Sequence, residues 1–565
     1  MMIDVVQCAR GSVLGLVVIA LGWAQATAAQ SVSYHGFDPF VLSAGSPPQV
    51  LFFAEVTGSP TRVTLDFNPG QLGAPTTFSL HDDGASGDRA AGDRIYSVQL
   101  PSAQILAAIR ASDVQRVFVG FLNVSNGTTN VFRGNIFADV YTSGAGVFPI
   151  AQLSPTVQAT SRLVNINDPA YFSGGDITHV TREFYRWFGD DYDFINLIYT
   201  PARFSNRNHF AVRNDVEGIG MARFNNSSTY GSLGRLQGIS QFPIPDYFDG
   251  AETAHIHELA HQWVNFLNFA PLGTAIPHWP LSSMAGGVMG FSIGGTGGEG
   301  GNFACDVVDR SGQIVLNRRP DEPVFNDLEL YLMGLLPASQ VRQQIVFTDQ
   351  TAALSLTCTG QTFTGAVTRL SANDVIAQYG ARRPAAGDAP TRFRIATILV
   401  TRDGLASREA MWLYSWFADR AEWRAPLPIH SGFVKATGMP FYVATGQRAS
   451  LDMRIGVAIP DFSILPTPGT VTTTAGTPVT FKINALPTGQ AYAGDVSFSC
   501  ADLPAHASCV FTPSHAAPND RGAEVTLTIA TRDASAAVSA GTHVIVVNGA
   551  ADAVQHNTVV ALTVR

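Results

Sequence analysis

The pentapeptide His257-Glu258-Leu259-Ala260-His261 is the stretch of sequence that decides the fold of the central region. Two histidines four residues apart on a helix lie on one face, so a single Zn²⁺ can take a nitrogen from each. The glutamate beside the first histidine can then polarise a water on that metal. Apolar residues recur around the motif at three- and four-residue spacing, which predicts a largely buried helix over residues 252–268. Because buried charged and polar groups need partners, the pattern indicates a zinc site.

A catalytic zinc site needs a third protein ligand, and the sequence offers two main candidates. His278 follows a Pro-Leu-Gly turn at 271–273 that can bring the chain back to the metal. Glu329 lies in an almost wholly apolar stretch, 325–335, where a carboxylate needs a partner. Two other roles for Glu329 stay open: a capping box with Asn326, or a hydrogen bond that orients a ligand histidine. Asp246 and Asp306 are weaker alternatives.

The same motif predicts the other chemical roles of a metal-dependent hydrolase. Glu258 would take a proton from the attacking water and pass it to the leaving group. A polar side chain would stabilise the oxyanion, and the candidates are Tyr331, Tyr230 and His209.

Charge and the N-terminal segment limit the location and the partners of the protein. The 565 residues carry a net charge of −9, which argues against nucleic acid as a partner. An apolar run at 12–24 after Arg10, followed by Ala-Thr-Ala at 26–28, predicts a bacterial export signal over 1–29. No second stretch is long enough to cross a bilayer, so we expect a secreted, periplasmic or cell-surface protein with no membrane span in its mature form.

Four cysteines remain after the predicted signal, and an even number in an exported protein predicts two disulfides. Proximity in the sequence favours the pairs Cys305–Cys358 and Cys500–Cys509. None of the four has the spacing of a zinc ribbon.

Composition shifts divide the remainder into three predicted domains. Residues 30–147 contain strand-like runs at 49–56, 61–67, 116–124 and 130–141, which indicate a β-sandwich. Residues 148–456 form a mixed α and β domain, with a helix expected at 177–188, a buried strand at 193–199 and a further strand, a candidate edge strand, at 209–220. Residues 461–565 again contain short alternating strands.

A cluster of aspartates and glycines lies within the first of these domains. Asp82, Asp83, Asp88 and Asp93 can wrap a Ca²⁺, since clustered carboxylates with glycines are typical of calcium loops. Asp and Gly also form ordinary polar turns, and that alternative stays open.

Several motifs carry resemblances to known families. The order of elements leading to the HExxH helix resembles that of the zincin metallopeptidases. A third histidine at His278, followed by Met284 and Met289 in a glycine-rich segment, resembles the metzincins, although Val264 and Leu267 stand where their pattern has a glycine and a histidine. Leishmanolysin-like members of that group have a long insertion before the third histidine. A downstream glutamate ligand, here Glu329, would instead resemble the gluzincins.

The flanking domains resemble accessory modules of exported bacterial proteins. The segment from Asp82 to Asp93 and the last hundred or so residues are both similar to bacterial Ig-like domains. Together these resemblances imply an α+β zincin-like catalytic domain flanked by all-β Ig-like sandwiches.

Two functions therefore stay open at this point. The first is a secreted zinc-dependent endopeptidase that acts on a protein or peptide substrate. The second is a non-catalytic, zinc-stabilised adhesion or binding protein, in which a closed four-ligand site is expected. A glycosidase with paired carboxylates has no specific motif behind it. No pattern indicates the oligomeric state.

Overall fold

The computed structural model describes residues 30–71, 75–109, 116–204, 207–243, 255–264, 266–292, 301, 303–319, 324–431 and 434–565, with the backbone alone over 427–438. The predicted signal peptide and Asp246 lie outside the described residues. The chain is mostly β and forms several separate sheets, which confirms the prediction of a multidomain, β-rich protein. None of the described helices is both long and apolar enough to span a membrane.

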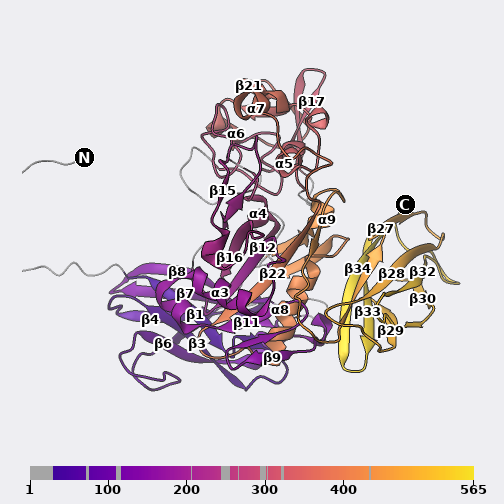
Figure 1. Cartoon of the computed structure of the whole chain (residues 1–565). Coiled ribbons are helices and arrows are strands. Elements are labelled where there is room, and N and C mark those ends of the chain that lie inside the picture. The colour runs from indigo at the N-terminus through magenta and orange to yellow at the C-terminus, as the bar shows by residue number, and fades with distance from the viewer. Residues whose placement is uncertain are drawn as a thin grey trace, which may run out of the picture.

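Two sheets form the N-terminal region (Figure 1). One contains β1 (Val32–Asp38), β3 (Gln49–Val56) and β6 (Ile95–Pro101). The other contains β2 (Val41–Leu42), β4 (Arg62–Phe67), β5 (Thr76–Ser79), β7 (Arg116–Asn126) and β8 (Thr129–Val140), and α1 (Ser102–Ala107) follows β6. Alternate residues of β3 are buried, so each sheet turns one face to a shared core. A distant hairpin, β23 (Leu427–Ser431) with β24 (Val434–Gly438), joins the larger sheet where Ser431 pairs with Arg116. The strand pairs of both sheets are antiparallel except for β2 with β8 and β7 with β23.

The central sheet has the order β13-β16-β12-β22-β11-β10-β9, and β25 also pairs with β22. Its strands are β9 (Ala151–Ser154), β10 (Val157–Ala159), β11 (Val164–Asn167), β12 (Phe194–Thr200), β13 (Asn208–Ala211), β16 (Gly238–Pro243), β22 (Arg392–Thr401) and β25 (Ser450–Asp452). β16, β12, β22 and β11 run parallel, and β13 is an antiparallel edge strand. Every residue of β12 is buried because helices cover both faces of the sheet.

The helices that cover this sheet are α2 (Pro169–Gly174), α3 (Ile177–Trp187), α4 (His255–Ala260), α8 (Arg408–Arg420) and α9 (Phe441–Ala444), and α5 (Asp327–Met333) lies beyond the sheet but shares a core with α4. The predicted helix at 177–188 and strand at 193–199 agree with α3 and β12 to within one residue at each end. The predicted strand at 209–220 is too long. The Asn214 side chain donates to the carbonyls of Val216, Met221 and Ala222, and it thereby folds the chain into a loop after β14 (Arg213–Asn214).

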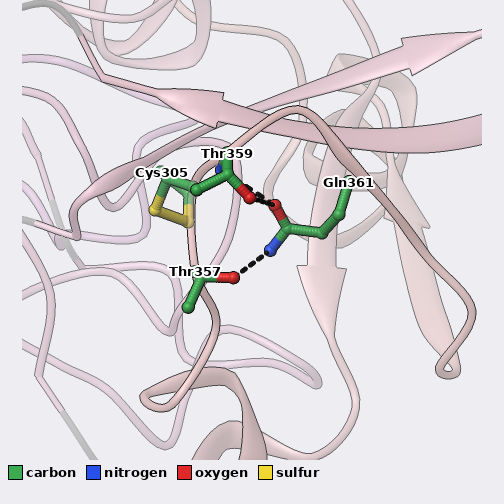
Figure 2. The surroundings of a disulfide bond; sticks show 5 residues. Cys305, Thr357, Thr359 and Gln361 are labelled. Atoms are coloured by element: carbon green, nitrogen blue, oxygen red, sulfur yellow. Dashed lines mark hydrogen bonds between the residues drawn. A yellow bond between two sulfur atoms is a disulfide. The ribbon is translucent and has the colours of Figure 1, made fainter.

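A further part of the central region extends beyond the sheet, at the end where Figure 1 labels α5, α6 and α7. It contains β17 (Cys305–Arg310), β18 (Gln313–Arg318) and β20 (Gln361–Phe363), and also β19 (Gln344–Phe347) paired with β21 (Val367–Leu370). Its other elements are β15 (Phe224–Asn225), which pairs with β14, α6 (Gln350–Ala353) and α7 (Ala372–Tyr379). The predicted disulfide Cys305–Cys358 is confirmed, and Figure 2 shows Gln361 hydrogen-bonded to Thr357 and Thr359 beside it.

The C-terminal region is a sandwich of two sheets that pack face to face. One has the order β26-β28-β32-β30 and the other β27-β34-β33-β29-β31. Their bounds are β26 (Phe462–Thr467), β27 (Thr470–Thr473), β28 (Val479–Pro487), β29 (Val496–Ala501), β30 (Ser508–Thr512), β31 (His515–Ala516), β32 (Ala523–Ala530), β33 (Gly541–Ala551) and β34 (Val554–Val564). The predicted Cys500–Cys509 disulfide is confirmed and joins the two sheets. Trp416 of α8 donates to Asn557 of β34, so this sandwich contacts the central region (Figure 1).

Candidate metal centre

Helix α4 carries the HExxH motif and is shorter than the sequence predicts. Its six residues, His255–Ala260, are all buried, and Ile256 and Leu259 pack into the core beneath the sheet. From His261 to Trp263 the backbone N–H groups bond to carbonyls three residues back, so the helix tightens into a turn. The predicted extension to residue 268 is therefore wrong, because the chain leaves the helix within one turn of the motif. Residues 252–254 lie outside the described part of the chain.

Three histidines meet at this point. The Nε2 atom of His257 is 3.2 Å from Nε2 of His261 and 3.2 Å from Nε2 of His278. The three ligand atoms all lie within 4.8 Å of one another. Two nitrogens bound to one tetrahedral zinc at about 2.0–2.1 Å are about 3.3–3.4 Å apart. The spacing of the rings thus fits a shared metal ion of that size.

The protonation state of the rings also suits a metal. Burial lowers the pKa of His257 to about 3 and that of His278 to about 4, and it lowers the pKa of His261 well below its ordinary value. All three imidazoles are therefore neutral at pH 7 and keep a lone pair. The Nδ1–H group of His257 donates to the Val288 carbonyl at 2.8 Å, which leaves Nε2 as the acceptor nitrogen.

The cluster is open on one side. His257 is buried, whereas His261 and His278 are partly exposed. The described residues bring no fourth His, Cys, Asp or Glu into the group. Three protein ligands with access to solvent are typical of catalytic zinc sites, while structural sites are closed by four.

Glu258 lies beside the cluster in a buried position. The residue is 5% exposed, and burial raises its pKa to about 7. The positive charge of Arg207 and a hydrogen bond from the backbone N–H of His209 oppose that shift. The Arg207 Nε atom is 3.5 Å from Glu258 Oε1. A carboxylate with a pKa near 7 can both accept and return a proton at neutral pH.

The structure places Glu329 outside the histidine group. Its carboxylate accepts a hydrogen bond from the indole N–H of Trp279 at 2.7 Å and one from the backbone N–H of Asn326 at 2.8 Å. The second bond belongs to a capping box at the start of α5, which is one of the alternatives left open by the sequence. Asp306, the other described alternative, is also absent from the group.

Of the three candidate oxyanion stabilisers, His209 is beside the centre. It lies on the edge strand β13, where Nε2 is 3.1 Å from the Gln262 side-chain oxygen and Nδ1 is 3.0 Å from the Ser240 hydroxyl. Gly238 provides the room, since a Cβ there would lie 2.4 Å from the His209 ring. The Tyr331 hydroxyl accepts from the Arg382 backbone N–H, and the Tyr230 ring packs on Phe210. The two tyrosines therefore have other partners.

Arg207 is the functional candidate that the sequence analysis missed. Its positive charge acts on His257 and His278 as well as on Glu258, and its side chain is 19% exposed. It precedes the edge strand in a polar stretch, Ser-Asn-Arg-Asn, with no periodicity or motif. No sequence signal distinguishes it from an ordinary surface arginine.

The aspartate cluster of the N-terminal region is partly assembled. Ligand oxygens of Asp82, Asp88 and Asp93 lie within 4.8 Å of one another, and Asp83 is not in that group. Asp82 accepts from the backbone N–H groups of Gly92 and Arg94, and Asp88 accepts from that of Gly84 at 2.6 Å. Asp83 instead accepts from the Ala85 N–H. Calcium at this loop stays a prediction.

Comparisons with known proteins give little further guidance. No family model matches the chain, and no curated protein matches it. Among solved structures, domains 4 and 5 of the S-layer protein SbsC align with 24% of this chain and 61% of their own, at 17% identity and a TM-score of 0.14. A longer SbsC structure aligns over 94% of this chain and 54% of its own, at 11% identity and the same TM-score. The complex of Dpr2 Ig1-Ig2 with DIP-Theta Ig1-Ig3 aligns at 6% identity and a TM-score of 0.13. Likeness at this level carries no argument about fold or function.

Proposed function

We propose that the protein is a secreted zinc-dependent endopeptidase whose central region is a zincin-like catalytic domain. The observation that carries the proposal is the convergence of three neutral histidine nitrogens beside the buried carboxylate of Glu258, which follows His257 on α4. That combination matches the donor set of a hydrolytic zinc site with three protein ligands and one open position. The export signal predicted at 1–29 supports action outside the cytoplasm on protein or peptide substrates.

The residues divide the work of peptide hydrolysis among them. Zinc held by His257, His261 and His278 would supply a Lewis acid for the scissile carbonyl and lower the pKa of water at the site. Glu258 accepts the proton of the attacking water and then delivers it to the leaving amine. The backbone N–H of His209 donates a hydrogen bond to this carboxylate, and together with the positive charge of Arg207 it holds the carboxylate in place.

Arg207 takes the role of oxyanion stabiliser in this proposal. Its Nε–H faces Glu258, and the guanidinium has four further N–H donors. Its charge already reaches His257 and His278, so negative charge that develops on the carbonyl oxygen beside them is stabilised.

The edge strand β13 supports an extended substrate. Among the described residues it is the outermost strand of the central sheet, and it pairs on one side only, with β16. A peptide can add to such an edge by main-chain hydrogen bonds. His209 lies on this strand, and its N–H bonds to Glu258, so a bound peptide would run past the general base.

The test is the Glu258→Gln variant of the mature protein. We expect zinc to stay bound and hydrolysis of unfolded casein to fall by several orders of magnitude, because the amide cannot accept the proton. Glu524→Gln, a solvent-exposed glutamate paired with Lys482 in the C-terminal sandwich, is the matched control and should keep full activity. Undiminished hydrolysis by Glu258→Gln would exclude Glu258 as the general base and with it the proposed zinc mechanism, and zinc binding without any hydrolysis by the wild type would favour the adhesion alternative.

A further inference from the structure

Glu329 is a fully buried carboxylate whose hydrogen bonds lead to the metal centre. The residue is 0% exposed. Its carboxylate accepts from the Trp279 indole at 2.7 Å, from the Asn326 backbone at 2.8 Å and from the backbone N–H of Met289. One side chain on α5 therefore ties together two segments that are distant from it in sequence.

Both tied segments touch the histidine cluster. Trp279 directly follows His278, and its own side chain is 1% exposed. Met289 directly follows Val288, whose carbonyl accepts the Nδ1–H of His257. The two segments also bond to each other, since the Ser292 N–H donates to the Trp279 carbonyl at 3.0 Å.

Helix capping alone does not account for the burial of Glu329. Helix α7 begins with an equivalent capping box, made by Ser371 and Asp374, and there the aspartate is exposed. Burial of a carboxylate is unfavourable unless its hydrogen bonds are satisfied. The Trp279 and Met289 bonds go beyond what a cap requires.

In the described part of the chain, the third histidine lacks the Nδ1 hydrogen bond that orients the first. His257 is fixed through Nδ1 by Val288, whereas the Nδ1 atom of His278 is buried without a partner among the described residues. The direction of the His278 ring is therefore set by its backbone, which the next residue, Trp279, anchors to Glu329.

We propose that Glu329 is a positioning residue of the metal centre, which aims His278 at the shared ligand position and holds the Val288 carbonyl against His257. This inference rests on the proposed zinc site but not on the peptidase activity. It assigns Glu329 an indirect role through Trp279 and Met289, where the sequence alone left metal ligation, helix capping and a direct hydrogen bond to a ligand histidine as alternatives.

The experiment measures zinc affinity by competition with a chromogenic chelator. Trp279→Phe deletes the indole N–H and keeps an aromatic ring, and Glu329→Gln replaces the carboxylate by an amide of the same shape. We expect each variant to raise the zinc Kd by about 10- to 100-fold, the usual effect of a partner that orients a ligand histidine. The control Asp374→Asn weakens the capping box of α7 and should leave the Kd unchanged.

Two further readouts separate positioning from general loss of structure. Cobalt-substituted Trp279→Phe and Glu329→Gln should show altered visible absorption bands, because the ligand geometry changes. Thermal unfolding in a chelator reports whether each metal-free variant is folded. The double variant should bind zinc about as weakly as the weaker single variant, since both changes act on the same hydrogen-bonded group.

The proposal is overturned if the Trp279→Phe and Glu329→Gln proteins are folded, bind zinc as tightly as the wild type and show an unchanged cobalt spectrum. A wild-type protein that binds no zinc also overturns it. If the wild type binds zinc but hydrolyses no casein while these variants lose zinc affinity, the peptidase assignment fails and the positioning role stands.

Discussion

The three histidines of the central region and the three aspartates of the N-terminal region form clusters of the same compactness, yet they differ in what satisfies their ligand atoms. In both groups the candidate atoms lie within 4.8 Å of one another. The histidine Nε2 atoms of His257, His261 and His278 face each other. The oxygens of Asp82 and Asp88 accept hydrogen bonds from backbone N–H groups of their own loop.

Proximity of ligand groups alone is therefore a weak indication of a metal. Ligand atoms that converge on one position and lack hydrogen bonds from their own backbone are a stronger indication. A loop whose aspartates bond their own backbone is held without an ion. Three neutral imidazoles that point at one position cannot all satisfy each other, because one N–H can serve only one lone pair at a time. We therefore expect the arrangement of the histidine cluster to depend on a bound metal ion. The arrangement of the aspartate cluster should depend little on an ion of its own.

Removal of the third histidine should have the largest effect. Zinc sites in small metal-binding domains have about 10–16 kcal/mol of binding free energy, so loss of one ligand of three removes roughly 4 kcal/mol. We expect His278→Ala to weaken zinc binding about a thousandfold by chelator competition. Asp88→Asn, the matching change in the other cluster, should leave zinc affinity unaltered.

Arg207→Ala should lower kcat by about a hundredfold with little change in KM, because its charge acts on the developing oxyanion. Steady-state kinetics on a quenched peptide measures both constants. Zinc content should stay at the wild-type level. Arg223→Ala, which removes a solvent-exposed arginine paired with Glu217, is the control. An Arg207→Ala enzyme with wild-type kcat would transfer the oxyanion role to another residue.

A buried histidine outside both clusters separates the effect of burial from that of metal binding. Burial lowers the pKa of His35 from 6.5 to about 3. The unfolded chain therefore binds a proton that the folded protein rejects, so stability falls as the pH drops from about 6.5 toward 3. Over 6.5 to 4 this amounts to at most about 3 kcal/mol.

The test is the His35→Gln variant, unfolded by urea at several pH values in the presence of zinc. Its free energy of unfolding should fall less steeply between pH 6.5 and pH 4 than that of the wild type. Parallel curves for the two proteins would show that His35 does not contribute to acid sensitivity.

Calcium should have the smallest effect of all. Because backbone N–H groups already bond Asp82 and Asp88, we expect millimolar calcium to shift the melting temperature by less than about 2 °C. Differential scanning calorimetry of the wild type and Asp82→Asn, with calcium and with EGTA, measures this. A shift of 5 °C or more in the wild type alone would place the aspartates with the histidines as a metal-dependent cluster.

Much of this arrangement could be predicted from local sequence. Short features of the chain are enough for three predictions. The HExxH spacing indicates a metal-binding helix, the apolar run at 193–199 predicts the buried strand β12, and the even cysteine count predicts two disulfides. The length of α4 could not be predicted, because the residues after His261 are apolar at helical spacing and yet form a tight turn.

The long-range contacts of the site also exceed what the sequence contains. Arg207 approaches Glu258 only because the edge strand β13 pairs with β16. The hydrogen bond between Glu329 and Trp279 joins residues 50 positions apart. Tertiary packing creates both contacts, and neither leaves a periodic pattern in the chain.

An X-ray absorption spectrum at the zinc edge of the zinc-loaded wild-type protein tests directly whether His257, His261 and His278 bind one zinc and leave a fourth position to solvent. We expect one zinc per chain with three imidazole nitrogens at about 2.0–2.1 Å and one oxygen ligand from solvent. A sulfur ligand, a fourth protein ligand that closes the site, or fewer than three imidazoles would contradict this expectation.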